Sequence, residues 1–404
     1  MDLSSLVVIP AIAVVAPLLA SSIGRFVKIP LVVFEIVLGV LLGPAVLGWV
    51  SETAFTETLA NFGLAMLFFL AGNEIDFASI AGRPLKRAGL GWLVSLAVGV
   101  LAGILLAPSL AAGVFIGIAL TSTALGTIMP VLRDAGELKT PFGRAVTAVG
   151  AVGEFGPLIA ISLFLSGRTP LHATLVLLGF AVIAGAGVWI AARGHHRTMH
   201  RVIASTLHTS AQFAVRLVIL ILAALVALSI VLGLDMLLGA FAAGVLYKLL
   251  LSGADAEDYE FVETKIEAVG FGFLVPIFFV YTGVTFDLDA LLGSTRALIL
   301  LPVFLVLLLV VRGIPSAFAA PPGATGADRR ALGLFGATGL PIIVAVTAIG
   351  VDTGDLQAST ASALVGAGML SVLLFPLLGL WQRRRSADGG VREPDADVAV
   401  PDEG

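Results

Sequence analysis

The sequence predicts an all-α polytopic membrane protein with about 13 transmembrane helices, and three observations lead to this fold class. First, 58% of the 404 residues are apolar and only 12% are charged, about half the charge that soluble domains carry. Second, the mean hydropathy is +1.07, and apolar stretches of about 20 residues recur along almost the whole chain. Third, these stretches lack the period-two alternation of the strands in an outer-membrane barrel.

The composition also excludes several classes of protein. A soluble globule of this length would need far more charge to cover its surface. The net charge is −4 and no segment is strongly basic, so we expect no nucleic acid partner. The chain has no Cys, which excludes disulfides and thiol chemistry. Neither a His-Glu-x-x-His zinc motif nor a Gly-x-Ser-x-Gly motif occurs, so we expect no enzyme and no cofactor.

Thirteen apolar stretches are long enough to be transmembrane helices. Twelve is the alternative count, if the ninth stretch enters and leaves on the same side. The first stretch follows Met1-Asp2 without a basic region, so we interpret it as a retained span and not as a signal peptide. The expected spans are 3–24, 29–50, 57–75, 88–108, 110–133, 142–166, 170–192, 208–233, 235–252, 266–286, 297–319, 329–351 and 357–382.

The distribution of Lys and Arg predicts the orientation of the chain. With the N-terminus outside, 19 of the 23 basic residues fall in inside loops or in the C-terminal tail, and only 2 fall outside. The other two, Arg216 and Arg312, lie within spans. We therefore expect a membrane domain over residues 1–385 and a disordered, acidic, cytoplasmic tail over residues 386–404.

Two pairs of similar segments indicate an internal repeat. LFFLAGNEIDF (Leu67–Phe77) and IFFVYTGVTFDL (Ile277–Leu288) share a Phe-Phe pair, a Gly and a following Asp. TSTALGTIMP (Thr121–Pro130) and TGLPII (Thr338–Ile343) each interrupt an apolar span with Thr, Gly and Pro. With 170–192 as a linker helix, the remaining spans form two six-helix units of opposite topology. Inverted repeats with paired discontinuous helices are typical of secondary transporters.

A discontinuous helix in mid-membrane can bind a cation. Unwinding exposes backbone carbonyl groups and two half-helix ends, and such backbone is tolerated where it lines a cavity or is buried in protein. The hydroxyl groups of Thr121, Ser122 and Thr123 add oxygen ligands that suit hard cations. The residues that we expect to break the two helices are Gly126, Pro130, Thr338, Gly339 and Pro341.

Glu154 is the strongest candidate for an ion-binding residue. It lies about 12 residues, or roughly 18 Å, into the span 142–166. Gly150, Gly153 and Gly156 surround it and allow a neighbouring helix to approach closely. A buried carboxylate can hold either a proton or a metal cation, but not both, and this competition is the basis of cation/proton exchange. The alternative is a protonated structural Glu that bonds to a neighbouring helix.

Other charged residues lie at or near membrane depth. Arg312 is roughly 12 Å deep and keeps its proton, so we expect it to face the broken-helix ends or a carboxylate; the alternative is that it reaches back to the interface. Glu35 is shallow enough to face a cytoplasmic vestibule. We place Glu74 and Asp76 at the outer end of the span 57–75, and Asp287 at the corresponding end of 266–286, as gate residues or secondary sites.

The motifs together resemble a known family. FEIVLGVLLGPAVLG, LFFLAGNEIDF, TSTALGTIMPVL and a mid-helix acidic residue, followed by PIFFVYTGVTFDL, VVRGIP and TGLPIIVAV, are similar to the second family of cation:proton antiporters (KefB/NapA-like sodium/proton and potassium/proton exchangers). The similarity covers roughly residues 3–382.

The resemblance implies a homodimer in which a core domain moves against a dimerisation domain. The dimer part would be about 1–80 and 205–290, and the core part about 85–167 and 294–382. Glu154 matches the ion-binding carboxylate, which would bind the transported monovalent cation, and Arg312 matches the basic residue beside it. The resemblance implies monovalent cations, protons and the lipid bilayer as partners, and the plasma (inner) membrane of a prokaryote as the location.

The sequence departs from this pattern in two places. Many relatives have two adjacent acidic residues where this chain has Gly153-Glu154, and many sodium-selective relatives have Lys where this chain has Arg312. With one exchanging carboxylate and one permanent cation, we predict one proton per Na⁺ or K⁺, hence electroneutral antiport. The alternatives are a sodium-coupled organic-anion symporter and an ion or pH sensor on the same scaffold.

Overall fold

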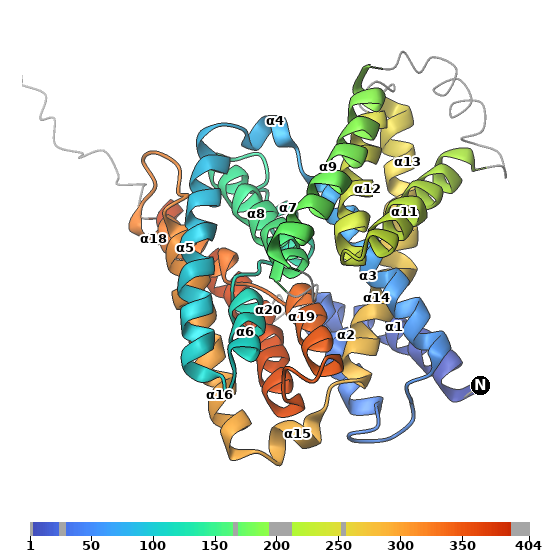
Figure 1. Ribbon diagram of the computed structural model, residues 1–404, viewed down its shortest axis with the longest axis vertical. Helices are drawn as coiled ribbons and strands as arrows, with labels where there is room; N and C mark the ends of the chain where they lie inside the picture. The colour runs from blue at the N-terminus through green and yellow to red at the C-terminus, as the bar shows by residue number, and fades with distance from the viewer. Residues whose placement is uncertain (1–2, 24–29, 165–168, 194–211, 252–255, 389–404) are drawn as a thin grey trace, which may run out of the picture.

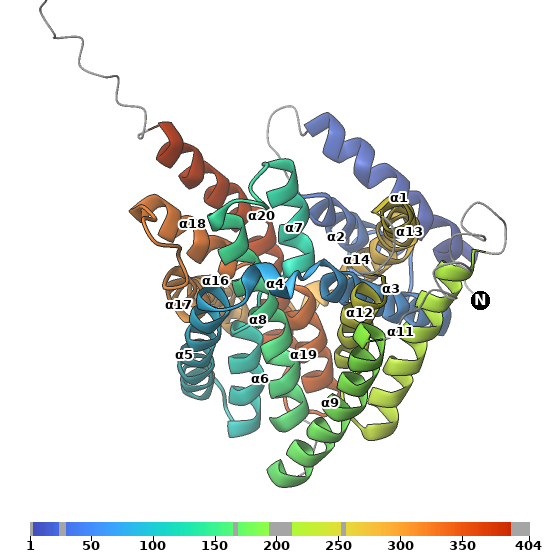
Figure 2. The same ribbon diagram turned by 90° about the horizontal axis from the view of Figure 1, so that it is seen from above.

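The computed structural model describes residues 3–23, 30–164, 169–193, 212–251 and 256–388 as a helical bundle without strands in these ranges (Figures 1 and 2). Arg25, Lys28, residues 194–211 and the part of the predicted disordered tail beyond residue 388 lie outside the described residues. The elements are α1 Leu3–Ile23, α2 Leu31–Leu42, α3 Ala54–Glu74, α4 Phe77–Ile80, α5 Arg83–Leu106, α6 Leu110–Leu120, α7 Leu125–Asp134, α8 Pro141–Phe164, α9 Pro170–Arg193, α11 Phe213–Leu232, α12 Met236–Leu251, α13 Ala256–Val269, π-helix η1 Gly270–Leu274, α14 Val275–Val284, α15 Leu288–Leu292, α16 Thr295–Leu307, π-helix η2 Leu308–Gly313, α17 Ile314–Ala317, α18 Gly326–Gly336, α19 Pro341–Asp352 and α20 Ala358–Asp388.

The lengths and hydropathy of these helices confirm a polytopic membrane protein. Within the described ranges, 9 helices or helix pairs are long and apolar enough to cross a bilayer. Four shorter apolar helices, Val7–Ile23, Leu31–Leu42, Leu171–Gly187 and Met236–Leu250, fall in the remaining predicted spans. The count of thirteen transmembrane helices therefore stays a prediction.

The helices pack into two groups. In the first, which we call the scaffold group (α1–α3 and α11–α14), α3 packs along α12 and α14, and α2 packs along α14. In the second, the core group (α5–α8 and α16–α20), α5 packs along α6 and α8, and α20 packs along α16 and α18. The helix α9 contacts both α8 and α12. Both views place most of the scaffold group on the right and most of the core group on the left (Figures 1 and 2).

Glycines bring helices of the scaffold group into backbone contact. A Cβ at Gly39 of α2 would meet the carbonyl oxygen of Val280 in α14, and one at Gly283 of α14 would meet that of Ile36 in α2. Each glycine thus lies against the backbone of the facing helix. Because lipid tails supply no hydrophobic driving force between membrane helices, close packing of this kind is a main source of helix association.

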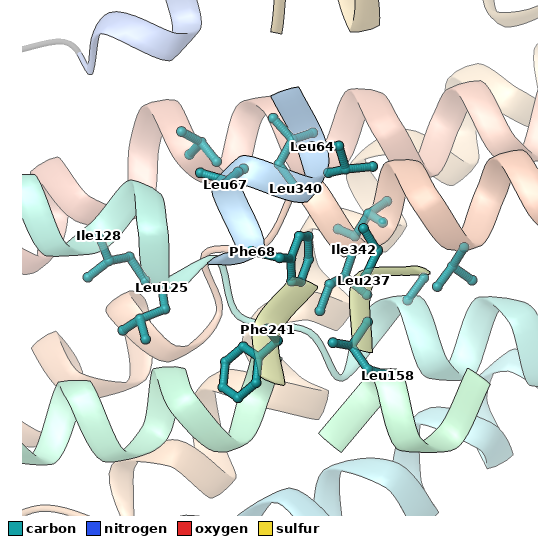
Figure 3. Close-up of a cluster of buried hydrophobic side chains, with 14 of the residues drawn as sticks. Leu64, Leu67, Phe68, Leu125, Ile128, Leu158, Leu237, Phe241, Leu340 and Ile342 are labelled. Atoms are coloured by element: carbon teal, nitrogen blue, oxygen red, sulfur yellow. The ribbon is translucent and has the colours of Figure 1, made fainter. Parts of the chain in front are cut away.

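An apolar seam separates the two groups (Figure 3). It consists of buried side chains from α3 and α12 on the scaffold side and from α7, α8 and the start of α19 on the core side. Such contacts are non-directional, so the two surfaces can shift against each other without breaking hydrogen bonds. The labelled members of the seam are Leu64, Leu67, Phe68, Leu125, Ile128, Leu158, Leu237, Phe241, Leu340 and Ile342.

Candidate functional site

The first discontinuous helix is interrupted between α6 and α7. Helix α6 ends at Leu120, because the hydroxyl groups of Thr121 and Ser122 donate to the carbonyls of Ile118 and Ala119, both at 2.8 Å. The chain then runs unwound to Ala124, and α7 begins at Leu125.

This position corrects the expected site of the break. Gly126 and Pro130 lie inside α7 and not in the interruption. Thr121 and Ser122 end the preceding helix, because their hydroxyls bond the carbonyls of its last turn. Thr121, Ser122 and Thr123 are all buried. The hydroxyls that we expected to bind a cation therefore bond the protein backbone in this conformation.

The second discontinuous helix is interrupted between α18 and α19. Thr338 and Gly339 lie in the gap, and Pro341 is the first residue of α19, a position that suits proline because its missing N–H needs no partner there. Ser371 of α20 holds this linker: its Oγ accepts from the amide of Gly339 at 3.1 Å. The interruption is thus fixed to the neighbouring helix of the core group.

The two linkers bond directly to each other. The amide of Ala124 donates to the carbonyl of Thr338 at 2.7 Å, and the hydroxyl of Thr123 donates to the carbonyl of Gly336 at 2.6 Å. The amide of Thr123 also donates to the carbonyl of Gly153 in α8 at 2.9 Å. The crossing therefore lies against α8, one residue from Glu154.

Arg312 lies beside the crossing and contacts both the linker after α6 and helix α8. It lies in the π-helix η2, is 0% exposed, and donates from Nε to the Thr123 hydroxyl at 2.8 Å and from Nη2 to the carbonyl of Val149 at 2.7 Å. Among the described residues it has no acidic partner within 4.0 Å. Of the alternatives from the sequence, a side chain that reaches back to the interface is not what the structure shows, because Arg312 is buried and contacts the linker between α6 and α7 and the unbroken helix α8.

Glu154 lies near the amide end of α7. The amide of Leu125, the first residue of α7, stabilises its carboxylate electrostatically, so the negative charge lies at the positive end of α7. The residue is 1% exposed, and Oε2 has no hydrogen-bond partner. A buried carboxylate with one free oxygen can bind a proton or a cation there.

The glycines of α8 make this arrangement possible. A Cβ at Gly150 would meet the Leu125 side chain, and one at Gly156 would meet the Trp92 ring. A Cβ at Gly153 would meet both the hydroxyl of Thr123 and the guanidinium of Arg312. The prediction that these three positions admit close neighbours is confirmed.

A cavity of about 720 Å³ leads toward this region. Its walls include Glu35 and Glu74 from the scaffold group, and Gly126 and Thr127 from the first turn of α7. The carboxylates of Glu74 and Glu154 interact electrostatically. The cavity thus reaches the first turn of α7, next to Glu154, although Glu154 is not among the residues that line the cavity.

The structure corrects the placement of two acidic residues. In the predicted orientation Glu74 and Asp76 lie at the inner end and not at the outer end, because Glu74 is 3.7 Å from Arg133, one of the basic residues that we expect inside. Asp287 caps α15 by accepting from the amide of Ala290 at 2.8 Å, and α15 lies at the other end of the bundle from α4, which follows α3 (Figure 1). Corresponding ends in an inverted repeat lie on opposite sides, so the ends of spans 57–75 and 266–286 cannot both face outward.

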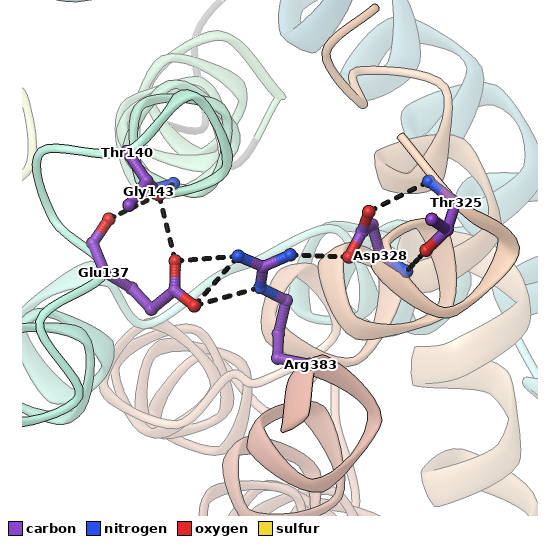
Figure 4. A network of polar contacts seen from close by, with 6 residues as sticks. All are labelled: Glu137, Thr140, Gly143, Thr325, Asp328 and Arg383. Atoms are coloured by element: carbon purple, nitrogen blue, oxygen red, sulfur yellow. Dashed lines mark hydrogen bonds and ion pairs between the residues drawn. The ribbon is translucent and has the colours of Figure 1, made fainter. Parts of the chain in front are cut away.

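A polar clamp at the end of the bundle near the cavity was not predicted (Figure 4). Arg383 of α20 donates to Glu137, in the loop before α8, at 2.9 and 3.0 Å, and to Asp328, in the first turn of α18, at 2.6 Å. Asp328 also accepts from the amide of Thr325 at 2.9 Å. In the sequence these residues are loop and tail charges, and only the run of three arginines at 383–385 marked the position.

Comparisons with known proteins agree on one family. The family model described as sodium/hydrogen exchanger, transmembrane, matches residues 11–380. The chain is 27% identical over 399 residues to YjbQ of Bacillus subtilis, covering 93% of this chain but only 62% of YjbQ. It is 25% identical over 356 residues to the Na⁺/H⁺-K⁺ antiporter GerN of Bacillus cereus, covering 86% of this chain and 88% of GerN.

A solved structure shares the fold. The sodium proton antiporter MjNhaP1 of Methanocaldococcus jannaschii superposes with a TM-score of 0.67 and covers 94% of this chain, at 15% sequence identity. The overall helical fold therefore occurs in a protein of very different sequence.

Proposed function

The chain belongs to the sodium/hydrogen exchanger family, and from this membership we propose that it is a secondary active antiporter that exchanges a monovalent cation for a proton across the membrane. The name of GerN, a Na⁺/H⁺-K⁺ antiporter, supports Na⁺ or K⁺ as the cation. The Na⁺/H⁺ antiporter of Enterococcus hirae, 25% identical over 90% of this chain, supports the same activity. None of these comparisons favours a sodium-coupled organic-anion symporter or an ion or pH sensor.

The observation that carries the proposal is the carboxylate of Glu154. It is buried at the crossing of two discontinuous helices, one oxygen has no protein partner, and the amide of Leu125 stabilises the negative form. A cation that reaches this oxygen displaces the proton, and a returning proton displaces the cation. Thr121, Ser122 and Thr123 hold the broken helix open so that the amide end of α7 faces the carboxylate.

Transport requires the site to face each side of the membrane in turn. We propose that the core group moves along the apolar seam against the scaffold group, and that the cavity beside Glu35 and Glu74 is the path to the cytoplasm. The scaffold group would form the dimer contact, with the N-terminus outside and the C-terminus in the cytoplasm. No cofactor takes part in this cycle.

Arg312 makes the exchange electroneutral in this proposal. Its guanidinium stays protonated and donates to Thr123 and Val149, so Glu154 is the one group at the crossing that exchanges its ion. One proton then replaces one monovalent cation, and the charge of the moving site is the same in both directions. A current on a solid-supported membrane that follows cation transport and persists with balanced ion gradients would contradict this stoichiometry.

The exchange can be tested in everted membrane vesicles with an acid-quenched fluorescent dye. Respiration acidifies the lumen, after which Na⁺, K⁺ or Li⁺ is added. We expect fluorescence to recover with wild type and with Glu57→Gln, an exposed residue in the first turn of α3, but not with Glu154→Gln. Recovery with Glu154→Gln would keep antiport but move the site, and no recovery with wild type would refute antiport.

A further inference from the structure

Arg133 joins the two helix groups at the mouth of the cavity. It lies in the last turn of α7, in the core group, and its guanidinium faces two carboxylates of the scaffold group. Nη2 lies 3.7 Å from Oε1 of Glu74 at the end of α3, and Nη1 lies 3.6 Å from Oε1 of Glu267 in α13. The other ion pairs between described residues, those of Arg383, stay within the core group.

These contacts are longer than those of Lys248 and Arg383, two basic residues that bond within their own groups. Inside the scaffold group, Lys248 of α12 donates to the carbonyl of Asn73 at 2.7 Å, and inside the core group Arg383 donates to Asp328 at 2.6 Å. The Arg133 pairs exceed hydrogen-bond length, and the Arg133 side chain is 52% exposed. Pairs of this kind are weak enough to break and re-form in every transport cycle.

The carboxylate of Glu74 depends on the positive charge of Arg133. Its side chain is only 8% exposed, and its Oε2 has no hydrogen-bond partner. A buried carboxylate is costly without a nearby positive charge. Arg133 supplies one from the moving side of the seam, in the conformation in which the cavity is open. Movement of α7 away from α3 would withdraw it.

We propose that Arg133 is a gating residue that latches the core group to the scaffold group in the cavity-open conformation, and this inference rests on the proposed exchange cycle. Release of Arg133 from Glu74 and Glu267 then accompanies each movement of the core group. Loss of the latch shifts the population toward the conformation in which the cavity is closed. If Arg133 formed only an ordinary surface ion pair, its loss would leave the populations of the two conformations unchanged. The two possibilities therefore predict different results.

The absence of Cys from the sequence allows a direct test with single reporter cysteines. Thr127→Cys reports from the cavity wall, and Ile342→Cys reports from the buried seam. Purified protein in lipid nanodiscs would be labelled with a water-soluble maleimide. With Arg133→Gln we expect labelling of the cavity reporter to slow and labelling of the seam reporter to accelerate. The ratio of the two labelling rates should change about two- to tenfold. General loosening of the fold would accelerate both reporters.

Two further variants complete the test. Arg330→Gln removes an exposed arginine at the same end, one that donates to Gln382 within the core group, and should leave both rates unchanged. Glu267→Gln should shift the ratio of labelling rates less than Arg133→Gln does. The double variant Arg133→Gln/Glu267→Gln should give the same ratio as Arg133→Gln alone. Equal ratios in wild type and Arg133→Gln would overturn the latch. Because labelling requires no ion exchange, this outcome is distinct from a failure of the antiport assay.

Discussion

Replacing Arg383 by Gln should destabilise the core group measurably. The wild-type guanidinium donates to Glu137 through Nε at 3.1 Å and Nη2 at 2.9 Å, and to Asp328 through Nη1 at 2.6 Å. It also lies 4.4 Å from the ring centre of Phe142 in α8. A Gln side chain carries no charge and lacks the planar fork, so both carboxylates lose their partner.

The expected magnitude follows from the exposure of the three side chains. Arg383 is 22% exposed, Glu137 18% and Asp328 12%, so the cluster is neither a surface pair nor fully buried. Exposed pairs contribute about 0.2–1 kcal/mol, whereas breaking a buried pair costs about 3–5 kcal/mol. We expect the free energy of unfolding to fall by about 2–3 kcal/mol. For a chain of this size that corresponds to a midpoint lower by about 2–4 °C.

Thermal unfolding in detergent, followed by intrinsic fluorescence, measures this effect. The matched control is Arg384→Gln, which removes the same charge from the adjacent exposed residue and should shift the midpoint by less than about 1 °C. Arg383→Lys keeps the charge without the fork and should give an intermediate midpoint. Equal midpoints for Arg383→Gln and Arg384→Gln would refute the reasoning, because the shift would then not depend on the clamp.

Two further predictions concern the crossing itself. Gly153→Ala places a methyl group against Thr123 and Arg312, so it should abolish cation-dependent fluorescence recovery in the vesicle assay and lower the free energy of unfolding by about 1–3 kcal/mol. The control is Gly179→Ala, whose Cβ has no atom within 4 Å and which should keep full activity. Arg312→Lys cannot reproduce the two hydrogen bonds to Thr123 and Val149, so it should lower the unfolding free energy by about 1–3 kcal/mol and slow exchange. A wild-type rate with Gly153→Ala, or wild-type stability with Arg312→Lys, would show that the linkers tolerate displacement.

The site residues that could be predicted from the sequence are polar or ionisable residues within apolar spans. Glu154 and Arg312 are ionisable groups in apolar spans, where burial is costly and therefore rare without a reason. Thr-Ser-Thr and Thr-Gly-Leu-Pro interrupt apolar runs in the same way. The prediction for the first break was wrong, because Gly126 and Pro130 are accommodated within a helix and the hydroxyl groups before them end one. In the structure, the Thr121 and Ser122 hydroxyls end α6, and Pro130 lies within α7.

The polar contacts at the cavity end could not be predicted from the sequence. Arg383 and Glu137 are 246 positions apart, and both are charged residues near predicted span ends, where charge is ordinary. The same is true of Arg133, which served only to orient the chain. A loop charge acquires a particular partner through the folding of the bundle, and its own sequence neighbourhood carries no signal of that partner.

The separation of Arg312 from Glu154 bears on how the site can work. Each broken helix has a negative end, where carbonyls are free, and a positive end, where amides are free. Arg312 donates to the Thr123 hydroxyl and to a carbonyl of α8, and Glu154 lies near the positive end of α7, so neither charge has the other as its partner. Glu154 can therefore change its ion without depriving Arg312 of a partner. Loss of Arg312 should disturb the crossing, whereas Glu154→Gln should leave the fold intact and remove the exchanging group.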